Sequence, residues 1–368
     1  MSSYDIDVDA CRGRQQRLVA EMQKLDLDLV IVTQNANVQW LCGVWFAWLF
    51  EPAAAMSVDG HLTLVAPNEA PAKAAADHIT TYEAQCLFTM RNDQRQASSE
   101  SLLRALAGKP KSERVGVEYS TFGPHLAQAV EAELVDIERV LYVQRRRKDP
   151  DELALIRNAI AGTASMYQTA REIIKPGICE LEVFNQFQAA AVDQFGEMLT
   201  GTGNDYQCAS MGGPPRGDRK AEAGELYILD LGPAFRGYFT DNCRTIAVTH
   251  PTDEQQEAWE YITKVFKFIE QTVRPGSNAK WLYHEALSLI EDAPLGTCPH
   301  HLGHGFGLYP HEAPHLNPNW DDTFLCGDVF TVEPGLYAPE LRAGIRVENN
   351  YRVTEIGVEL LTDFPLDL

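Results

Sequence analysis

Two stretches in the C-terminal half of the chain repeat one pattern at one spacing, and this repeat limits the possible folds more than any other feature. Residues 224–232 read Gly-Glu-Leu-Tyr-Ile-Leu-Asp-Leu-Gly, and residues 327–335 read Gly-Asp-Val-Phe-Thr-Val-Glu-Pro-Gly. Each has a turn glycine, an acidic residue, a short apolar run, a carboxylate and a second glycine. Each then reaches another carboxylate, Asp241 or Glu348. The pattern predicts one strand–turn–strand unit used twice.

The repeat extends upstream of these strands. Lys-Pro-Gly at 175–177 and Arg-Pro-Gly at 274–276 each end one helical pattern and precede another, and Pro-Gly is a strong helix stop. The segment from about residue 150 to the end is therefore predicted to be a pseudo-two-fold domain with a site where its halves meet. Four carboxylates are expected at that seam: Asp230, Asp241, Glu333 and Glu348.

Four carboxylates in a low-dielectric seam repel one another, so they either share protons or bind cations. A nearby histidine favours a metal. The segment 299–314 supplies one, since it reads Pro-His-His-Leu-Gly-His-Gly-Phe-Gly-Leu-Tyr-Pro-His-Glu-Ala-Pro. Its glycines allow the backbone to approach a ligand closely. An oxygen-rich site with one imidazole suits Mn²⁺, Co²⁺ or Fe²⁺, and Zn²⁺ is a further option.

Composition excludes several classes of protein. The net charge of −21 and the pI near 4.8 argue against a nucleic-acid partner. The apolar stretch 29–50 is interrupted by polar residues, so no membrane span is expected. The eight cysteines are scattered without a Cys-x-x-Cys pair, and the first eleven residues are largely polar and acidic. A cytoplasmic location is therefore expected.

The N-terminal part alternates short apolar runs with helical patterns, which predicts a small α/β domain over a mixed or parallel sheet. The basic run 145–148 marks a change in composition and is interpreted as a solvated linker, giving domains 1–145 and 146–368. Predicted strands are 29–33, 62–66, 114–118 and 134–137. Predicted helices are 12–25, 69–77, 94–107 and 123–133.

Five motifs in the C-terminal part occur in order. They are Asp230, Asp241 in Asp-x-x-Arg-Thr, His304 in His-Gly-Phe-Gly-Leu, Glu333 in Glu-Pro-Gly-Leu-Tyr and Glu348 in Gly-Ile-Arg-Val-Glu. Together they resemble the metal ligands of the creatinase/methionine-aminopeptidase, or pita-bread, superfamily. The resemblance is closest to its prolidase and Xaa-Pro aminopeptidase branch. Residues 35–43 are similar to an N-terminal motif of that branch.

The resemblance implies a fold, an activity and a metal site. The fold class is α/β (α+β), with a small creatinase-like N-terminal domain and a C-terminal pita-bread domain. Two divalent ions, Mn²⁺ foremost, would be bridged by Asp241 and Glu348. Asp230 would complete one site, and His304 with Glu333 the other. The expected reaction is hydrolysis of Xaa-Pro bonds by a metal-bridging hydroxide, on a small peptide substrate, in a homodimer.

The resemblance also assigns roles beside the metals. His300 is expected to bind substrate and stabilise the oxyanion, and His311 to handle a proton near the scissile nitrogen. Glu333 is expected to take a proton from the attacking water. Arg346 is expected to orient a ligand carboxylate, and Tyr337 to hydrogen-bond at the edge of the site. His301 and His315 are interpreted as structural or rim residues.

The chain departs from the family pattern at two positions. Gly213 stands where related peptidases carry a histidine, seventeen residues before Asp230, and Asn349 stands where an aspartate is usual. Arg216, in Gly-Pro-Pro-Arg, is interpreted either as a ligand for a substrate carboxylate or as a solvated surface residue. These departures keep two alternatives open. One is a non-peptidase relative acting on a small carboxylated or cationic molecule, such as an ectoine hydrolase or a dimethylsulfoniopropionate lyase, and the other is a non-catalytic binding module.

The aromatic residues Trp45, Phe46 and Trp48 are explained equally well in two ways. They could wall the substrate pocket of a partner subunit, or they could belong to a core or a plain dimer interface.

Overall fold

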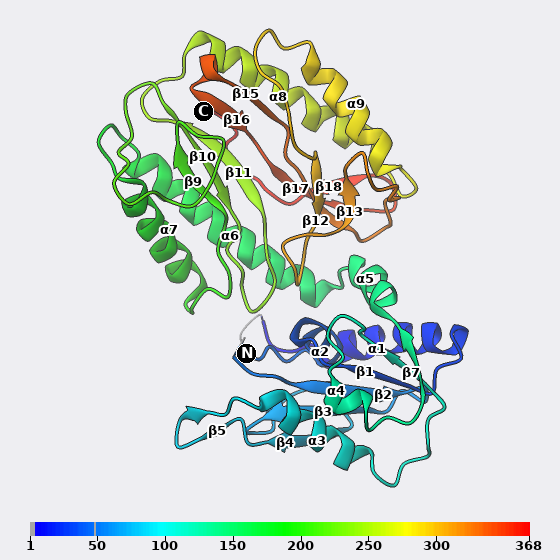
Figure 1. The fold of residues 1–368 in the computed structure, drawn as a ribbon. Helices are drawn as coiled ribbons and strands as arrows, with labels where there is room; N and C mark the ends of the chain where they lie inside the picture. Colours follow the sequence, from blue (N-terminus) through cyan, green and yellow to red (C-terminus); the bar gives the residue numbers. More distant parts are fainter. Residues whose placement is uncertain (1–3, 48) are drawn as a thin grey trace. The chain divides into compact units, whose positions relative to one another are not determined.

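The computed structural model describes residues 4–47 and 49–368. The chain divides into two compact units, Met1–Arg145 and Arg146–Leu368 (Figure 1). Of the N-terminal aromatic residues, Phe46 is buried and Trp45 is 40% exposed, whereas Trp48 lies outside the described residues.

The first unit is built on a six-stranded mixed sheet of order β4-β3-β2-β1-β7-β8. Its strands are β1 (Leu29–Val32), β2 (Ala53–Ser57), β3 (Leu62–Pro67), β4 (His78–Tyr82), β7 (Arg114–Val117) and β8 (Glu133–Asp136), with a separate hairpin of β5 (Gln85–Cys86) and β6 (Thr89–Met90). Its helices are α1 (Val8–Lys24), α2 (Asn35–Cys42), α3 (Gln94–Leu106), α4 (Pro124–Ala127) and α5 (Glu138–Arg146), the last ending just past the boundary. The mixed α/β character matches the prediction.

All four strands predicted in this unit are present, but two helix predictions are wrong. Residues 69–77 form no helix, although the segment is rich in alanine. It is a connection in which Ala75 N donates to Cys42 O and Asp77 N to Leu62 O, so tertiary hydrogen bonds replace helical ones. Residues 123–133 contain only the single turn α4. Short helices depend on tertiary packing, which a local pattern does not report.

The basic run at the boundary is not a solvated linker. The Arg146 guanidinium is buried and makes paired hydrogen bonds to Asp328, at 2.9 Å and 2.6 Å. Lys148 is also buried, with Nζ 2.8 Å from Glu312 Oε2. Arg147 alone points outward, with 63% of its side chain exposed. The run therefore ties the start of the second unit to that unit's later strands.

The second unit contains two successive helix–helix–strand sets. The first set is α6 (Pro150–Ile173), α7 (Glu180–Phe195), β9 (Asp205–Cys208), β10 (Leu226–Leu231) and β11 (Asn242–Ala247). The second set is α8 (Asp253–Thr272), α9 (Ala279–Glu291), β12 (Gly303–Gly305), β13 (Glu312–Leu316), β14 (Val329–Val332), β15 (Gly335–Ala338), the 3₁₀ turn η1 (Pro339–Leu341), β16 (Ala343–Arg346), β17 (Asn349–Val353) and β18 (Val358–Leu360). The sheet orders are β11-β10-β9, β13-β12-β14-β17-β18 and β15-β16.

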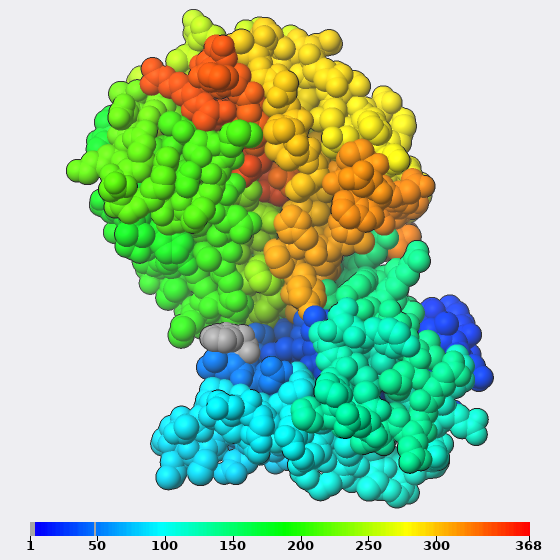
Figure 2. Space-filling view, viewed as in Figure 1, coloured from blue at the N-terminus to red at the C-terminus, as the bar shows by residue number. Residues whose placement is uncertain are grey.

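Each set has its own apolar core. Residues of α6 and α7 pack with β9–β11, and residues of α8 and α9 pack with the later strands (Figure 1). In Figure 2 the first half of this unit, in green, and the second half, in yellow and orange, meet side by side on one face. Within the described residues, no helix combines the length and apolar character needed to span a bilayer.

Candidate metal centre

Strand ends place the four carboxylates. Asp230 is the next-to-last residue of β10, and Asp241 immediately precedes β11. Glu333 immediately follows β14, and Glu348 immediately precedes β17. The antiparallel pairs β10–β11 and β14–β17 therefore each deliver two carboxylates to one end of a sheet.

The structure brings all five expected ligand residues together. One carboxylate oxygen each from Asp230, Asp241 and Glu348 lies within 4.8 Å of the others. Ligand atoms of His304, Glu333 and Glu348 form a second group of the same size. Glu348 belongs to both groups, so the residues could hold two ions with a shared ligand. All five side chains are buried.

The electrostatics of this cluster fit divalent cations. Both oxygens of Glu348 and Oδ1 of Asp230 are buried with no hydrogen-bond partner among the described residues. Burial, followed by the neighbouring carboxylate charges, raises the pKa of Asp241 and of Glu348 well above the usual range. The same causes raise the pKa of Glu333 to about 8. Unpartnered buried carboxylates with this mutual repulsion are the donor set that a divalent cation would neutralise.

The imidazole of His304 is oriented by its own backbone neighbour. Nδ1 lies 3.0 Å from Gly305 O, so Nδ1 carries the proton and the lone pair stays on Nε2. Nε2 lies 3.6 Å from both Asp241 Oδ2 and Glu333 Oε1. Burial lowers the pKa of His304 well below its usual range, which keeps the ring neutral. A neutral imidazole whose lone pair points towards carboxylates can bind a metal ion together with them, whereas a salt bridge would require a protonated ring.

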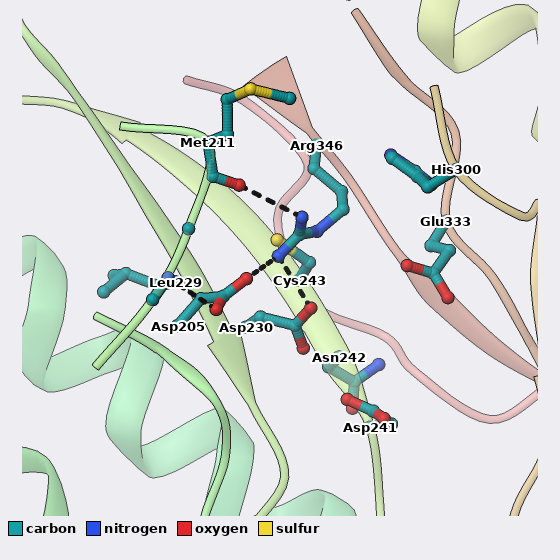
Figure 3. Close-up of polar contacts among 12 residues, drawn as sticks. Asp205, Met211, Leu229, Asp230, Asp241, Asn242, Cys243, His300, Glu333 and Arg346 are labelled. Atoms are coloured by element: carbon teal, nitrogen blue, oxygen red, sulfur yellow. Dashed lines mark hydrogen bonds and ion pairs between the residues drawn. The ribbon is translucent and has the colours of Figure 1, made fainter. Parts of the chain in front are cut away.

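His300 lies beside the cluster in a short hydrogen-bonded chain. Its Nδ1 is 2.7 Å from His301 O, and its Nε2 is 3.0 Å from the Tyr337 hydroxyl. That hydroxyl also accepts a hydrogen bond from Arg346 Nη1, at 3.1 Å. Arg346 in turn donates from Nη2 to Asp230 Oδ2, at 2.9 Å. The predicted residues His300, Tyr337 and Arg346 thus form one continuous network that ends on a candidate ligand. Figure 3 shows the contact of Arg346 with Asp230.

Two further histidines line the cluster. The His311 ring is stacked on that of His304 with centroids 3.7 Å apart, and the His311 side chain is exposed. His301, interpreted from sequence as a rim residue, has Nδ1 3.2 Å from Glu333 Oε1. Burial, followed by the charge of His300, lowers the pKa of His301 to about 4. His315 is instead paired with Asp322, at 2.8 Å.

The Arg216 guanidinium is already engaged within the fold. It donates to both carboxylate oxygens of Glu180 and, from Nη2 at 2.7 Å, to Cys208 O. Glu180 is fully buried at the start of α7 and needs a cationic partner. Arg216 therefore neutralises Glu180, while 38% of its side chain stays exposed. A substrate role for Arg216 stays a prediction.

The two departures from the family pattern have local explanations. Gly213 adopts a φ of +126°, and an added Cβ would lie 2.8 Å from the Gln207 side chain. The position therefore directs a side chain towards Gln207. Asn349 Oδ1 accepts hydrogen bonds from Arg244 Nη2, at 2.9 Å, and from the Thr362 hydroxyl, at 3.2 Å.

Asp205 is a further residue of this cluster, and it was not predicted from the sequence. Its carboxylate is largely buried and accepts a hydrogen bond from Arg346 beside Asp230 (Figure 3). No motif surrounds Asp205. Its only local signals are its place at the start of β9 and the Gly-Gly pair a few residues later.

The second unit and its site define a class of protein. The chain belongs to metallopeptidase family M24, whose model matches residues 154–355. Residues 14–146 match the creatinase/prolidase N-terminal domain. Membership in this family implies divalent metal ions.

Individual relatives support the same assignment. The chain is 32% identical over 235 residues to an uncharacterized peptidase of Staphylococcus aureus (strain MW2), a match that covers 62% of this chain and 66% of that protein. The match therefore spans just under two thirds of that relative's length.

Solved structures of prolidases and Xaa-Pro peptidases share the fold across both units. The prolidase from Pyrococcus horikoshii OT3 aligns with a TM-score of 0.80 at 25% identity, over 97% of this chain and 99% of that one. The Xaa-Pro dipeptidase from Bacillus anthracis aligns with a TM-score of 0.81 at 22% identity, again over 97% and 99%. The X-Pro aminopeptidase from Thermotoga maritima MSB8 gives 0.78 at 20% identity, over 96% and 98%. The predicted family and fold class are confirmed.

Proposed function

We propose that this protein is a dinuclear metal-dependent peptidase that hydrolyses the bond between a residue and a following proline. The observation that carries the proposal is the pair of buried ligand groups sharing Glu348, with carboxylate oxygens that lack hydrogen-bond partners among the described residues. Membership in family M24 and the fold shared with prolidases support the reaction class.

In this proposal Asp230, Asp241 and Glu348 would hold one ion. His304 and Glu333, together with Asp241 and Glu348, would hold the other. Two divalent ions, Mn²⁺ foremost, would supply charge to polarise the scissile carbonyl and to acidify the attacking water. Co²⁺, Fe²⁺ and Zn²⁺ are the alternatives that an oxygen-rich donor set with one imidazole admits.

The surrounding side chains have separate tasks. A carboxylate oxygen of Glu333 takes the proton of the attacking water. The neighbouring His301 Nδ1, 3.2 Å from Glu333 Oε1, makes no hydrogen bond among the described residues. The His301 carbonyl holds His300 Nδ1, and the Tyr337 hydroxyl contacts Nε2. To donate a hydrogen bond to the developing oxyanion, Nε2 would have to gain a proton and release the Tyr337 hydroxyl. His311, exposed beside His304, delivers a proton to the leaving proline nitrogen. The cytoplasmic location and the homodimer stay predictions.

The test is hydrolysis of Xaa-Pro dipeptides and Xaa-Pro-Xaa tripeptides by Mn²⁺-loaded protein. Matched Xaa-Ala peptides control for proline specificity, and chelator-treated protein controls for the metal. Metal-dependent cleavage of the proline peptides alone is expected, and the preferred length identifies a dipeptidase or an aminopeptidase.

One observation favours a second candidate. Gly213 replaces the family histidine, and its backbone geometry directs an added side chain towards Gln207. Protein that binds two metals but cleaves no Xaa-Pro peptide would contradict the peptidase proposal. It would favour a non-peptidase relative acting on a small carboxylated or cationic molecule. Protein that binds no divalent metal would instead support a binding module.

A further inference from the structure

Arg346 is shared between two carboxylates that come from different strands. Its Nη2 donates to Asp230 Oδ2, at 2.9 Å, and also to Asp205 Oδ2 (Figure 3). The Arg346 and Asp205 side chains are 9% and 17% exposed, so water screens this interaction weakly. Asp230 Oδ1 has no hydrogen-bond partner among the described residues. One oxygen of Asp230 therefore faces the guanidinium, and the other stays available to a cation.

A glycine-rich loop holds Asp205 in this position. Gly213 N donates to Asp205 Oδ1 at 2.6 Å, and Tyr206 N donates to Gly213 O at 2.8 Å. Gly212 adopts a φ of +134°, and a Cβ there would lie 2.3 Å from Asp205 Oδ2. Only glycine allows so close an approach in this backbone conformation. Gly212 thus leaves space for the Asp205 carboxylate, and Gly213 donates a hydrogen bond to it.

The same loop reaches Arg346 directly. Met211 O accepts a hydrogen bond from Arg346 Nη1, at 3.4 Å, and the same nitrogen donates to the Tyr337 hydroxyl, at 3.1 Å. Loop 211–213 therefore contacts both members of the Asp205–Arg346 pair.

The charges explain why Arg346 faces two carboxylates. An arginine facing Asp230 alone would form a two-pronged ion pair with both of its oxygens and compete with a cation for them. The second carboxylate, that of Asp205, accepts a hydrogen bond from the Arg346 guanidinium, so that this N–H is not donated to Asp230. It also offsets the arginine's positive charge near a dication.

We propose that Asp205, held by the Gly212–Gly213 loop, is a positioning residue that shares Arg346 with Asp230 and so sets the affinity of the metal subsite that Asp230 completes. This inference rests on the proposed dinuclear site. It also explains why glycines stand at positions 212 and 213, because this pair leaves space for the Asp205 carboxylate.

The test is metal binding to Asp205→Asn, which keeps the side chain's shape and removes its charge. Mn²⁺ and Co²⁺ titrations by calorimetry would be combined with metal analysis after dialysis at limiting metal. One of two binding events is expected to weaken about 10-fold to 100-fold, as for other residues that hold metal ligands in place. The visible absorption of bound Co²⁺ should change for that event alone.

Asp218→Asn is the matched control, since it makes the same change at an exposed position a few residues further along the chain. It should bind both metals as the wild type does. Gly212→Ala is an independent second variant, because the added methyl displaces the Asp205 carboxylate without changing any charge. Gly212→Ala should weaken the same metal-binding event. If Asp205→Asn does not fold, the result for Gly212→Ala tests the positioning role of Asp205.

The outcomes separate this inference from the proposed function. Equal affinities for both metals in wild type, Asp205→Asn and Gly212→Ala would overturn the positioning role and leave the dinuclear site intact. Equal weakening of both metals, with a lower melting temperature of the metal-free protein, would show a general structural role and also overturn it. A wild-type protein that binds no divalent metal would contradict both proposals.

Discussion

Individual residues in the centre carry out different tasks because their local partners differ. Asp241 and Glu348 are buried among like charges, and this burial raises the pKa of both carboxyl groups. His304 has one nitrogen satisfied by its own backbone neighbour, which leaves the other free. The Tyr337 hydroxyl joins His300 to Arg346 without facing a carboxylate itself. Substitutions at these positions should therefore have different effects on metal content and on turnover.

Replacing Asp241 should abolish activity through metal loss. Asp241→Ala removes one of the three carboxylates in the group that also contains Asp230 and Glu348, so this group would bind a cation more weakly. We expect metal content to fall and kcat/KM to fall about 1,000-fold or more. Metal analysis and peptide hydrolysis on the same preparation would measure both, with Asp218→Ala as the control. An active Asp241→Ala protein with full metal content would contradict the assignment.

Removing the Tyr337 hydroxyl should separate turnover from metal binding. Tyr337→Phe deletes the group that hydrogen-bonds His300 Nε2 and Arg346 Nη1 but touches no candidate ligand directly. One such hydrogen bond is worth about 1–1.5 kcal/mol, so kcat should fall about 10-fold with two metals still bound. A loss of metal equal to that of Asp241→Ala would show that Tyr337 instead supports the ligands.

At the level of elements, a buried ion pair secures the start of α7. Glu180 accepts hydrogen bonds from Cys208 N and Arg216 N, both near 3 Å, and from the Arg216 guanidinium. Helix N-termini favour negative charge, and a fully buried carboxylate needs donors on both oxygens. Loop 209–217 is therefore attached to α7 at one end and to the candidate centre at the other.

Breaking this pair should lower stability in a pH-dependent way. Burial raises the pKa of Glu180, but hydrogen bonds from Arg216 and Cys208 outweigh it and lower the pKa below its ordinary value of 4.5. A carboxyl whose folded-state pKa is lowered stabilises the fold above its unfolded pKa, and this contribution is lost as pH falls through the folded value. Arg216→Met should cost about 2 kcal/mol at pH 7 and progressively less below about pH 4.5.

Urea unfolding at several pH values would measure that difference. Arg157→Met is the control, because Arg157 and Glu359 form an exposed pair, 48% and 37% accessible, which should contribute little at any pH. An undiminished difference at pH 3 would contradict the role of Glu180. A raised KM in Arg216→Met with unchanged stability would support a role of Arg216 in binding the substrate.

For the whole molecule, the candidate centre links the two halves of the second unit. Asp230 and Asp241 come from the first set of strands, whereas Glu333 and Glu348 come from the second. Without cations, their mutual repulsion opposes the packing of the halves. In the proposed dinuclear site, bound ions would therefore contribute to folding as well as to catalysis.

Metal removal should lower the melting temperature reversibly. An ion at 100 times its Kd adds about 2.7 kcal/mol, so chelation should lower the Tm by about 5 °C or more. Calorimetry with chelator, then with added Mn²⁺, would measure the loss and its recovery. Asp241→Ala should show little Mn²⁺-dependent shift. A wild-type Tm insensitive to chelator and to added metal would contradict the site.

Short-range patterns were sufficient to predict most of the α/β framework and the four converging carboxylates, and the family resemblance added His304 to them. Strand ends, glycine turns and the spacing of the repeat are local properties, and the strand periodicity of two fixes which residues share a face of the sheet. Asp230, Asp241, Glu333 and Glu348 therefore converge as expected. The adjacent carbonyl that orients His304 is likewise a neighbour in the sequence.

The contacts that tune the centre depend instead on residues far apart in the chain. Asp205 meets Arg346 across 141 residues, and Arg146 meets Asp328 across 182. Asp205 was not predicted, and the basic run was wrongly predicted to be solvated, because the buried partner of a charged side chain cannot be recognised from the local sequence. Burial decides whether such a charge is screened by water or must be paired, and burial arises only when distant segments pack together.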